Sequence, residues 1–283
     1  MKSIIDYFNK KLDRKSIVRN NFLLNCIILT LISVLVAVGS SKFLFSYSLP
    51  TENFVTVEIS GILEIPCSSE INSDYLSSLD TGIELDCTPQ RIDIYTTRAS
   101  AAAISRVDGT TFLLTAEHFC EAEASIEAQI HDDIRDYVEI KTIIYKDDIE
   151  YEFDIIKFDK ANDLCLLSSE EYYIEDSLKL AKKMPEVGER TSTVSSPLGI
   201  SERGVSLHFS GAFSGCNSYT CFFTIPAISG SSGSLVLNYD KEIVGITQRS
   251  LIGFPEVTIG SGIEDITEFI REYENESEID ITP

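Results

Sequence analysis

The amino-acid sequence predicts an all-β barrel or sandwich that ends in a single helix. Short segments rich in β-branched and aromatic residues follow one another from Arg91 onwards, and turn signals such as Asp108-Gly109 separate them. Only residues 262–273 show a convincing helical period. The apolar face of that segment consists of Ile263, Ile266, Phe269 and Ile270. With 283 residues, 43% of them apolar, the chain is long enough for one two-lobed globular unit and further segments.

The expected strands are placed along the chain by their alternation or by continuous apolar runs. They cover residues 54–59, 62–65, 92–95, 101–104, 111–114, 137–145, 151–158, 164–167, 191–194, 205–209, 221–225, 234–237 and 242–247. The first two are expected to pair with each other across Ser60-Gly61. Residues 43–90 as a whole are interpreted as a juxtamembrane spacer joined to an N-terminal extension, and residues 275–283 as an acidic tail.

A basic segment followed by an apolar run opens the chain. Residues 22–38 read FLLNCIILTLISVLVAV, and with the residues up to 42 they are long enough to cross a bilayer of ~30 Å as a helix. We therefore expect a transmembrane signal-anchor over residues 22–42. The basic residues 1–21 predict a cytoplasmic tail, with the remaining domain outside the cytoplasmic membrane, in the periplasm or the extracellular space. A cleaved signal peptide, which would release a secreted protein, is the competing interpretation.

Charge and composition exclude several classes of function. The net charge is −22, which is unfavourable for binding nucleic acid. The first 22 residues carry +4, and the rest therefore carries about −26, which indicates a solvated acidic surface. The chain has three histidines and no pair of cysteines with C-x-x-C spacing, so neither a metal site nor a cofactor is expected.

Six of the seven cysteines lie beyond the apolar segment, an even number that suits an oxidising compartment. The plausible bridges are Cys67–Cys87 and Cys216–Cys221. Cys165 lies within an apolar strand and is interpreted as a buried thiol.

The segment Gly230-Ser231-Ser232-Gly233-Ser234 has the composition of a nucleophile turn. Its glycines allow positive φ angles, which turn backbone N–H groups toward a common point. A serine exposed among such donors meets the requirements of acyl transfer for a nucleophile and an oxyanion hole. Taken alone, the same segment is equally compatible with an ordinary Ser/Gly hairpin loop.

A serine nucleophile needs a general base to accept its proton. His118 is the strongest candidate, because it stands where the strand 111–114 ends and a turn begins. His208 lies inside an alternating strand and His131 in a polar loop, so neither is preferred.

The base in turn needs a carboxylate that fixes its tautomer. Asp163 heads the apolar strand 164–167 directly after a turn at Asn162. It is preferred to Asp154, which also precedes apolar residues but without so sharp a break.

Three segments resemble the active-site boxes of trypsin-like serine proteases. Thr115 to Cys120, TAEHFC, is similar to their Thr-Ala-Ala-His-Cys box, and Asp163 to Leu167, DLCLL, to their Asp-Leu-Ala-Leu-Leu box. Gly230 to Ser234, GSSGS, resembles their Gly-Asp-Ser-Gly-Gly box. The order His, Asp, Ser is that of chymotrypsin and differs from that of α/β-hydrolases. The resemblance covers residues 91–272.

Connecting segments are also similar to bacterial HtrA-type proteases. Val187-Gly188-Glu189 and Ser196-Pro197-Leu198-Gly199 resemble their Val-Gly and Asn-Pro-Phe-Gly segments, and residues 242–247 resemble the strand after the nucleophile. The resemblance implies a two-barrel chymotrypsin-like fold. Residues 91–185 would form the N-terminal barrel, and residues 186–274 the C-terminal barrel and helix.

The resemblance also implies roles for single residues. Ser232 would attack the peptide carbonyl, His118 would act as general base and then acid, and Asp163 would orient it. The N–H groups of Gly230 and Ser232 would form the oxyanion hole. Thr247 would support the carboxylate through its hydroxyl and begin the strand that binds substrate.

The sequence departs from the family pattern at several positions. Ser231 replaces the acidic residue that pairs with a freshly cut N-terminus in zymogens, so activation by such a cut is not expected. Ser234 replaces the second glycine of the box, and Cys120 lacks its usual partner on the strand 101–104. No PDZ-like segment follows the terminal helix.

The resemblance also bears on the substrate preference. Pro226 lies where trypsin has an aspartate at the floor of its specificity pocket, so a Lys/Arg preference is not expected. A small or apolar P1 side chain is the first expectation, and an acidic one that reaches Arg249 is the alternative.

We therefore predict a membrane-anchored serine endopeptidase that acts on polypeptides. A catalytically inactive protease fold used as a binding module is the alternative, motivated by Ser231 and Ser234. A β-rich adhesion or structural ectodomain, in which the candidate residues would be scattered, is a third possibility.

Overall fold

The computed structural model describes residues 49–282, with gaps at 66–89, 131, 133, 199 and 201–206. The predicted cytoplasmic tail, the signal-anchor over 22–42, most of residues 43–90 and the cysteines at 67 and 87 lie outside the described residues. Among the residues that are described, no helix is long and apolar enough to span a membrane.

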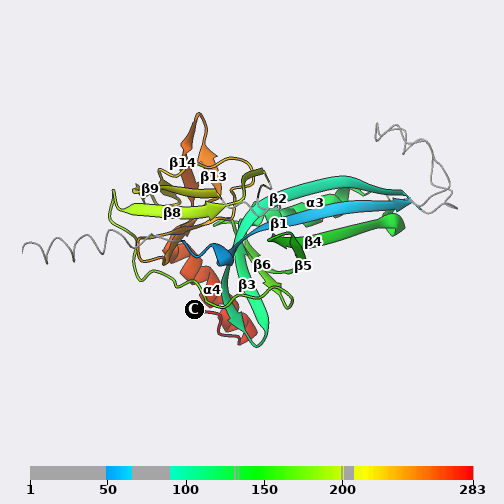
Figure 1. The fold of residues 1–283 in the computed structure, drawn as a ribbon, viewed down its shortest axis with the longest axis horizontal. Helices are drawn as coiled ribbons and strands as arrows, with labels where there is room; N and C mark the ends of the chain where they lie inside the picture. The colour runs from blue at the N-terminus through cyan, green and yellow to red at the C-terminus, as the bar shows by residue number, and fades with distance from the viewer. Residues whose placement is uncertain are drawn as a thin grey trace, which may run out of the picture. The chain divides into compact units, whose positions relative to one another are not determined.

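The predicted strands form two antiparallel sheets (Figure 1). The first sheet has the strand order β5-β4-β1-β2-β3-β7-β6. Its strands are β1 (Phe54–Ile65), β2 (Gln90–Val107), β3 (Thr110–Thr115), β4 (Val138–Lys146), β5 (Ile149–Glu152), β6 (Asp154–Asp159) and β7 (Leu164–Ser169). The short 3-10 helices η1 (Thr51–Asn53) and η2 (Arg135–Tyr137) precede β1 and β4.

The second sheet has the order β12-β11-β8-β9-β10-β14-β13. Its strands are β8 (Arg190–Ser195), β9 (Leu207–Cys216), β10 (Cys221–Phe223), β11 (Leu235–Leu237), β12 (Ile243–Ile246), β13 (Arg249–Leu251) and β14 (Phe254–Gly260). The hairpin of β13 and β14 was not expected from the sequence. The predicted bridge between Cys216 and Cys221 is present, and it joins register partners of β9 and β10.

The N-terminal strands differ from the prediction. Residues 54–65 form one strand, β1, which lies between β4 and β2 rather than folding back on itself at Ser60-Gly61. Only a register irregularity between Gly61 and Ile62 marks the expected turn. Part of the expected extension is therefore a central strand of the first sheet. The strands expected at 92–95 and 101–104 are likewise two parts of β2.

A helix that the sequence did not predict follows β3. This helix, α3 (Glu117–Gln129), lies along the long β1–β2 ribbon in Figure 1. Its segment is dominated by Glu and Ala, so the apolar period is weak. Three of its side chains, Phe119, Ala122 and Ile126, are nevertheless buried. Tertiary packing thus decides the conformation of a segment whose own pattern is indistinct.

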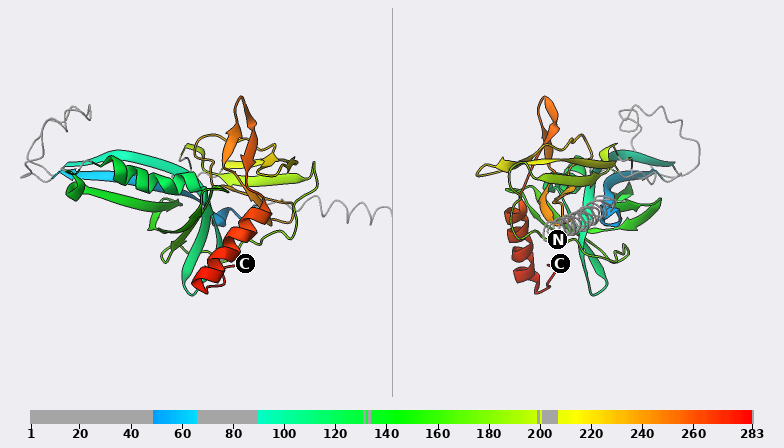
Figure 2. Two further views of the ribbon diagram at one scale, coloured as in Figure 1. Left: turned by 180° about the vertical axis from the view of Figure 1, so that it is seen from behind. Right: turned by 60° about the vertical axis from the view of Figure 1, so that its left-hand side comes forward.

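The predicted C-terminal helix is present as α4 (Ile263–Ser277). Figure 2 shows it, in red, beside the second sheet. All four residues of its predicted apolar face are buried, in one cluster with strands β11 and β12.

The first sheet is buried on both faces at its centre. Leu113 and Leu167 pack in the cluster that includes α3, whereas Leu114 and Leu166 pack in the cluster that includes the second sheet and α4. Every residue of β7 is buried, which explains the continuous apolar run from Leu164 to Leu167. Of the candidate residues, His118 follows the end of β3, Asp163 directly precedes β7, and Ser232 lies before β11 of the second sheet.

Candidate active site

His118 and Asp163 are paired in the structure. The Nδ1 atom of His118 lies 2.9 Å from Oδ1 and 3.0 Å from Oδ2 of Asp163. Because a carboxylate only accepts hydrogen bonds, Nδ1 carries the proton and donates, and Nε2 is left as the acceptor. Asp154, the carboxylate that the sequence offered as the alternative, lies exposed at the start of β6 and does not make this contact. His208 lies exposed on β9, and His131 is outside the described residues.

The same carboxylate also stabilises the start of α3. Oδ1 of Asp163 accepts the backbone N–H of His118 at 3.0 Å, in the first turn of the helix. Ala116, at the N-cap position, makes no side-chain cap. The carboxylate therefore satisfies an N–H group that the helix leaves open and adds negative charge at the positive end of its dipole.

The turn that carries Asp163 is fixed by its own hydrogen bonds. Asp163 has a φ of 50° and follows a turn in which Asp159 accepts the N–H of Ala161 at 2.8 Å and the amide of Asn162 at 2.7 Å. Aspartate tolerates the left-handed region better than most residues. The turn thus presents the carboxylate to α3.

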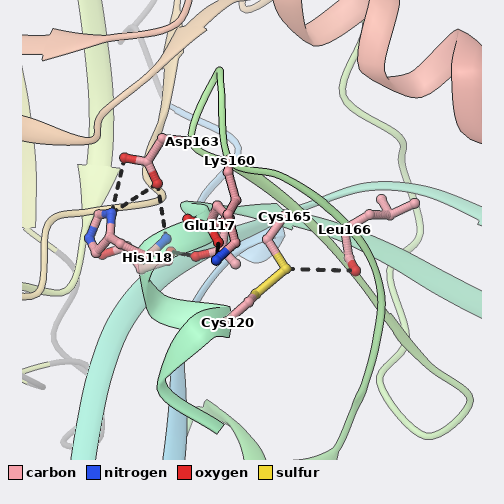
Figure 3. Close-up of a disulfide and its surroundings, with 9 residues drawn as sticks. Glu117, His118, Cys120, Lys160, Asp163, Cys165 and Leu166 are labelled. Atoms are coloured by element: carbon pink, nitrogen blue, oxygen red, sulfur yellow. Dashed lines mark hydrogen bonds and ion pairs between the residues drawn. A yellow bond between two sulfur atoms is a disulfide. The ribbon is translucent and has the colours of Figure 1, made fainter. Parts of the chain in front are cut away.

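A disulfide between Cys120 and Cys165 runs beside this pair (Figure 3). Each cysteine lies two residues after one member of the pair, so the bridge and the hydrogen bonds join the same two segments. The interpretation of Cys165 as a buried thiol was wrong, because α3 brings Cys120 over β7. This α3 position also supplies Cys120 with a partner other than the strand 101–104.

The electrostatic environment favours the charged imidazole. The hydrogen bond that the His118 ring donates to Asp163 raises the pKa of His118, and burial opposes this effect in part. The charge of Glu117 also raises the pKa of His118, whereas that of Arg249 lowers it. Burial raises the pKa of Glu117 itself, whose carboxylate lies 4.0 Å from the Lys160 ammonium.

Ser232 lies in the turn before β11, and its Oγ donates a hydrogen bond to the carbonyl of Gln248 at 2.8 Å. Within the described part of the chain, no hydrogen bond joins Ser232 to His118. The structure therefore brings two of the three candidate side chains into direct contact and holds the third on a neighbouring carbonyl.

Gln248 links the turn to the His–Asp pair, a role that was not predicted from the sequence. Its side-chain amide donates to the carbonyl of Asp163 at 3.0 Å and to the Oγ of Ser261, also at 3.0 Å. Its own carbonyl accepts the Ser232 hydroxyl. The one available signal was a long polar residue directly after a buried strand, since a buried amide needs partners.

The role expected of Thr247 is corrected. Its hydroxyl is buried without a hydrogen-bond partner among the described residues, so it does not support Asp163. Its carbonyl accepts the N–H of Gly233 and its N–H donates to Ser234, so both peptide groups are occupied within the turn. Pro226 is half-buried in the segment before the turn. The next residue, Ala227, donates its backbone N–H to the carbonyl of Pro255 in β14.

Two N–H groups of the turn have no acceptor in the described chain, those of Gly230 and Ser232. In each of these two peptide groups, the carbonyl oxygen accepts a hydrogen bond. The carbonyl of Ser229 accepts the N–H of Leu198 at 3.0 Å, and that of Ser231 accepts the N–H three residues further on at 3.2 Å. Both N–H groups are therefore fixed in direction while remaining free to donate.

The peptide groups that link Gly230 to Ser231 and Ser232 to Gly233 are hydrogen-bonded through both their carbonyl and their N–H. The carbonyls of Gly230 and Ser232 accept the hydroxyl and the N–H of Ser100, at 2.7 and 2.8 Å. The N–H groups of the same two peptide units donate to the carbonyls of Ile228 and Thr247. The four consecutive peptide groups from Ser229 to Gly233 are thus each oriented by hydrogen bonds to other parts of the chain.

Two positions of the turn require glycine. Gly230 and Gly233 have φ angles of 87° and 86°. A Cβ on Gly233 would lie 2.0 Å from the carbonyl oxygen of Ser100, and one on Gly230 would lie 2.7 Å from the nitrogen of Leu198. The turn therefore packs directly on β2 and on the segment after β8.

The described residues hold no group of three or more His, Cys, Asp or Glu side chains that could bind a metal ion. The site is built from a paired imidazole, a serine and free peptide N–H groups.

Comparison with known proteins identifies a domain family and similar folds. The model of the trypsin-like peptidase domain matches residues 101–246, just over half of the chain. No curated protein matches the sequence. The active form of the Rv3671c protease from M. tuberculosis is similar, with 12% identity, a TM-score of 0.49 and coverage of 77% of this chain and 79% of that chain. The serine endoprotease from Yersinia pestis has 13% identity, a TM-score of 0.49 and coverage of 78% and 63%. Deg5 has 13% identity, a TM-score of 0.47 and coverage of 74% and 85%.

The two disulfides predict different effects on stability. The bridge of Cys120 and Cys165 closes a loop with a sequence separation of 45, and that of Cys216 and Cys221 one of 5. Chain entropy alone gives about 4 and about 2 kcal/mol respectively. Replacing each pair by alanine should therefore lower the free energy of unfolding more for the first pair, as measured by urea denaturation.

The same variants also test whether the first bridge supports the His–Asp pair. Without it, the NMR titration of His118 should move toward the pKa of an ordinary histidine, because its hydrogen bond to Asp163 loosens. The Cys216/Cys221 variant is the matched control and should leave that titration in place. An unchanged titration in both variants would mean that the pair is held by its hydrogen bonds alone.

Proposed function

Because the chain belongs to the trypsin-like peptidase domain family, we propose that it is a serine endopeptidase that cleaves polypeptides through an acyl-enzyme. We further propose that the two sheets are the two barrels of a chymotrypsin-like fold. The observation that carries the proposal is the bridging position of Gln248. This residue is hydrogen-bonded both to the Ser232 hydroxyl and to the main chain of Asp163, which holds His118.

The proposed nucleophile is Ser232, with His118 as its base. For the reaction, the Ser232 hydroxyl leaves the Gln248 carbonyl by rotation about χ1, a movement between staggered wells. Its proton passes to Nε2 of His118 as Oγ bonds to the substrate carbonyl carbon. The resulting imidazolium is stabilised by Asp163 and returns the proton to the leaving amine. Water then repeats the sequence on the acyl-enzyme.

The free N–H groups of Gly230 and Ser232 are the proposed oxyanion hole. Negative charge develops on the substrate oxygen during attack, and fixed donors stabilise that charge without reorganising. Each such donor contributes on the order of 10²–10³ in rate. Support for this assignment comes from the bonds that hold the opposite carbonyl of each peptide group.

The substrate preference is part of the proposal. Pro226 supplies no charge near the turn, which favours a small or apolar P1 side chain. Arg249 directly follows Gln248 and is exposed, which favours an acidic P1 side chain as the alternative. A substrate library varied at P1 decides between them.

An inactive binding module is the second candidate. The observation that favours it is the hydrogen bond of Ser232 to Gln248, which leaves His118 without a serine partner in the described structure. This candidate predicts capture of polypeptides without covalent chemistry.

Covalent labelling separates the two functions. Full-length protein treated with a serine-directed peptidyl phosphonate should gain one label on Ser232, located by mass spectrometry, and should lose its cleavage of an unfolded protein. Ser232→Ala should neither react nor cleave, with a rate loss of roughly 10⁵- to 10⁶-fold. Ser218→Ala, which removes an exposed serine outside the turn, is the control. An unlabelled wild-type chain that binds polypeptides as tightly as Ser232→Ala would identify the binding module.

The pH dependence of kcat/KM should follow the ionisation of His118. A general base must be neutral, so activity is lost as pH falls through its pKa. Because the Asp163 hydrogen bond raises that pKa, the acidic limb should lie above the range of an ordinary histidine. Arg249→Gln removes a charge that lowers the pKa and should move the limb to higher pH. Glu117→Gln should move it to lower pH, and shifts in the same direction would contradict the assignment.

We also propose that the domain is anchored outside the cytoplasmic membrane by residues 22–42. The support is the basic segment followed by the apolar run in the sequence. The full-length chain should sediment with membranes and resist alkaline extraction, whereas a chain that begins at Ser46 should stay soluble. A soluble product whose N-terminus lies shortly after residue 39 would instead identify a cleaved signal peptide.

A further inference from the structure

We propose that Ser100 is a positioning residue for the oxyanion hole, an inference that rests on the proposed peptidase function. Ser100 lies in β2 of the first sheet, whereas the turn with Ser232 belongs to the second. Only 1% of Ser100 is exposed to solvent. Its hydroxyl acts on the turn from a buried strand and touches no reacting atom.

All hydrogen-bonding groups of Ser100 are directed to the site. Its Oγ donates to the carbonyl of Gly230 at 2.7 Å and accepts the N–H of Ser196 at 2.9 Å. Its backbone N–H donates to the carbonyl of Ser232 at 2.8 Å. Its carbonyl accepts the hydroxyl of Thr115, three residues before His118, at 2.8 Å. One residue thus joins the strand that leads to the base with the turn that carries the nucleophile.

The hydroxyl binds one of the two peptide groups that flank Gly230, and it also binds the segment that holds the other. It binds the carbonyl of Gly230 directly. It also binds Ser196, the residue that begins the segment in which Leu198 holds the carbonyl of Ser229. The Ser100 oxygen therefore supports the orientation of the Gly230 N–H directly through the Gly230 carbonyl and indirectly through the segment of Ser196 and Leu198.

A glycine at position 230 makes such support necessary. Glycine has no Cβ to restrict φ and ψ, so its N–H keeps one direction only where external bonds hold the adjoining peptide groups. Without the hydroxyl, a buried carbonyl and a buried N–H group lose their partner, at a cost that rotation of Gly230 can relieve. Rotation would turn the donor away from the developing oxyanion.

The neighbours of Ser100 explain why the role falls to a serine. Residues 99 and 101–103 are all alanine and buried. These small side chains leave room for the turn, which lies directly against the strand. A Cβ on Gly233 would be 2.0 Å from the Ser100 carbonyl oxygen. Within this run, Ser100 alone has a side chain that can form a hydrogen bond.

The test compares Ser100→Ala with Ser105→Ala in the full-length protein. Ser105 is the matched control, since it lies in the same strand, is 3% exposed and has a hydroxyl without a partner among the described residues. For Ser100→Ala, kcat on a peptide substrate should fall ~10- to 100-fold while KM changes less than about threefold. The affinity for a peptidyl boronate, which forms a tetrahedral adduct, should fall by a similar factor. Ser105→Ala should match the wild type in all three.

The outcomes decide the inference separately from the proposed function. Ser100→Thr, which returns a hydroxyl, should recover most of the lost kcat. Equal kcat and boronate affinity in Ser100→Ala and wild type would overturn the inference while leaving the peptidase function intact. Loss of the cooperative melting transition in Ser100→Ala would mean that the residue is needed for folding, which also overturns it. A wild-type chain that neither cleaves nor reacts overturns both.

Discussion

The carboxylate of Asp163 is the contact on which the first half of the site depends. It binds the ring of His118 and the backbone N–H of the same residue, so it fixes the imidazole and the start of α3 together. The orientation of the ring and the start of the helix depend on the same carboxylate, because the side chain of the N-cap residue Ala116 cannot accept a hydrogen bond from the helix N-terminus. The disulfide two residues further along both segments restricts the same junction covalently. His118 is therefore held by a helix terminus, a hydrogen-bonded pair and a covalent bridge.

The second half of the site follows a different principle, close contact between backbones. Gly233 lies so near β2 that no side chain fits between them, and the carbonyls of the turn bind directly to Ser100. Gln248 connects the two halves, since it contacts the Ser232 hydroxyl and the Asp163 carbonyl. A buried polar network of this kind is favourable only when each group finds its partner. The relative placement of the two sheets is thus specified by hydrogen bonds at the site and by the apolar core beneath it.

Local patterns predicted what local sequence determines. The strand ends, the Ser/Gly turn and the apolar face of α4 are encoded in a few consecutive residues, and His118, Asp163 and Ser232 were chosen as candidates from them. The bonds of Ser100 to Gly230 and of Gln248 to Asp163 were not predicted, because they join residues separated by 130 and 85 positions. The same limit applies to the cysteines, where six candidates allow 15 pairings. The helix α3 was missed because its stability comes from packing and from the Asp163 carboxylate rather than from its own period.

The turn around Ser232 is held without the acidic residue that the trypsin-like box has in place of Ser231. Ser231 is 2% exposed, and its hydroxyl accepts the N–H of Ile228 at 3.3 Å, while its own N–H donates to the Ile228 carbonyl. With the bonds from Ser100 and Leu198, the hydrogen bonds that the described residues make to the turn all come from hydroxyl and peptide groups. These groups do not titrate near neutral pH, and none of them depends on a newly cut N-terminus. Protons therefore act on the site through the His–Asp pair, and the donors of the turn keep their direction as that pair changes its charge.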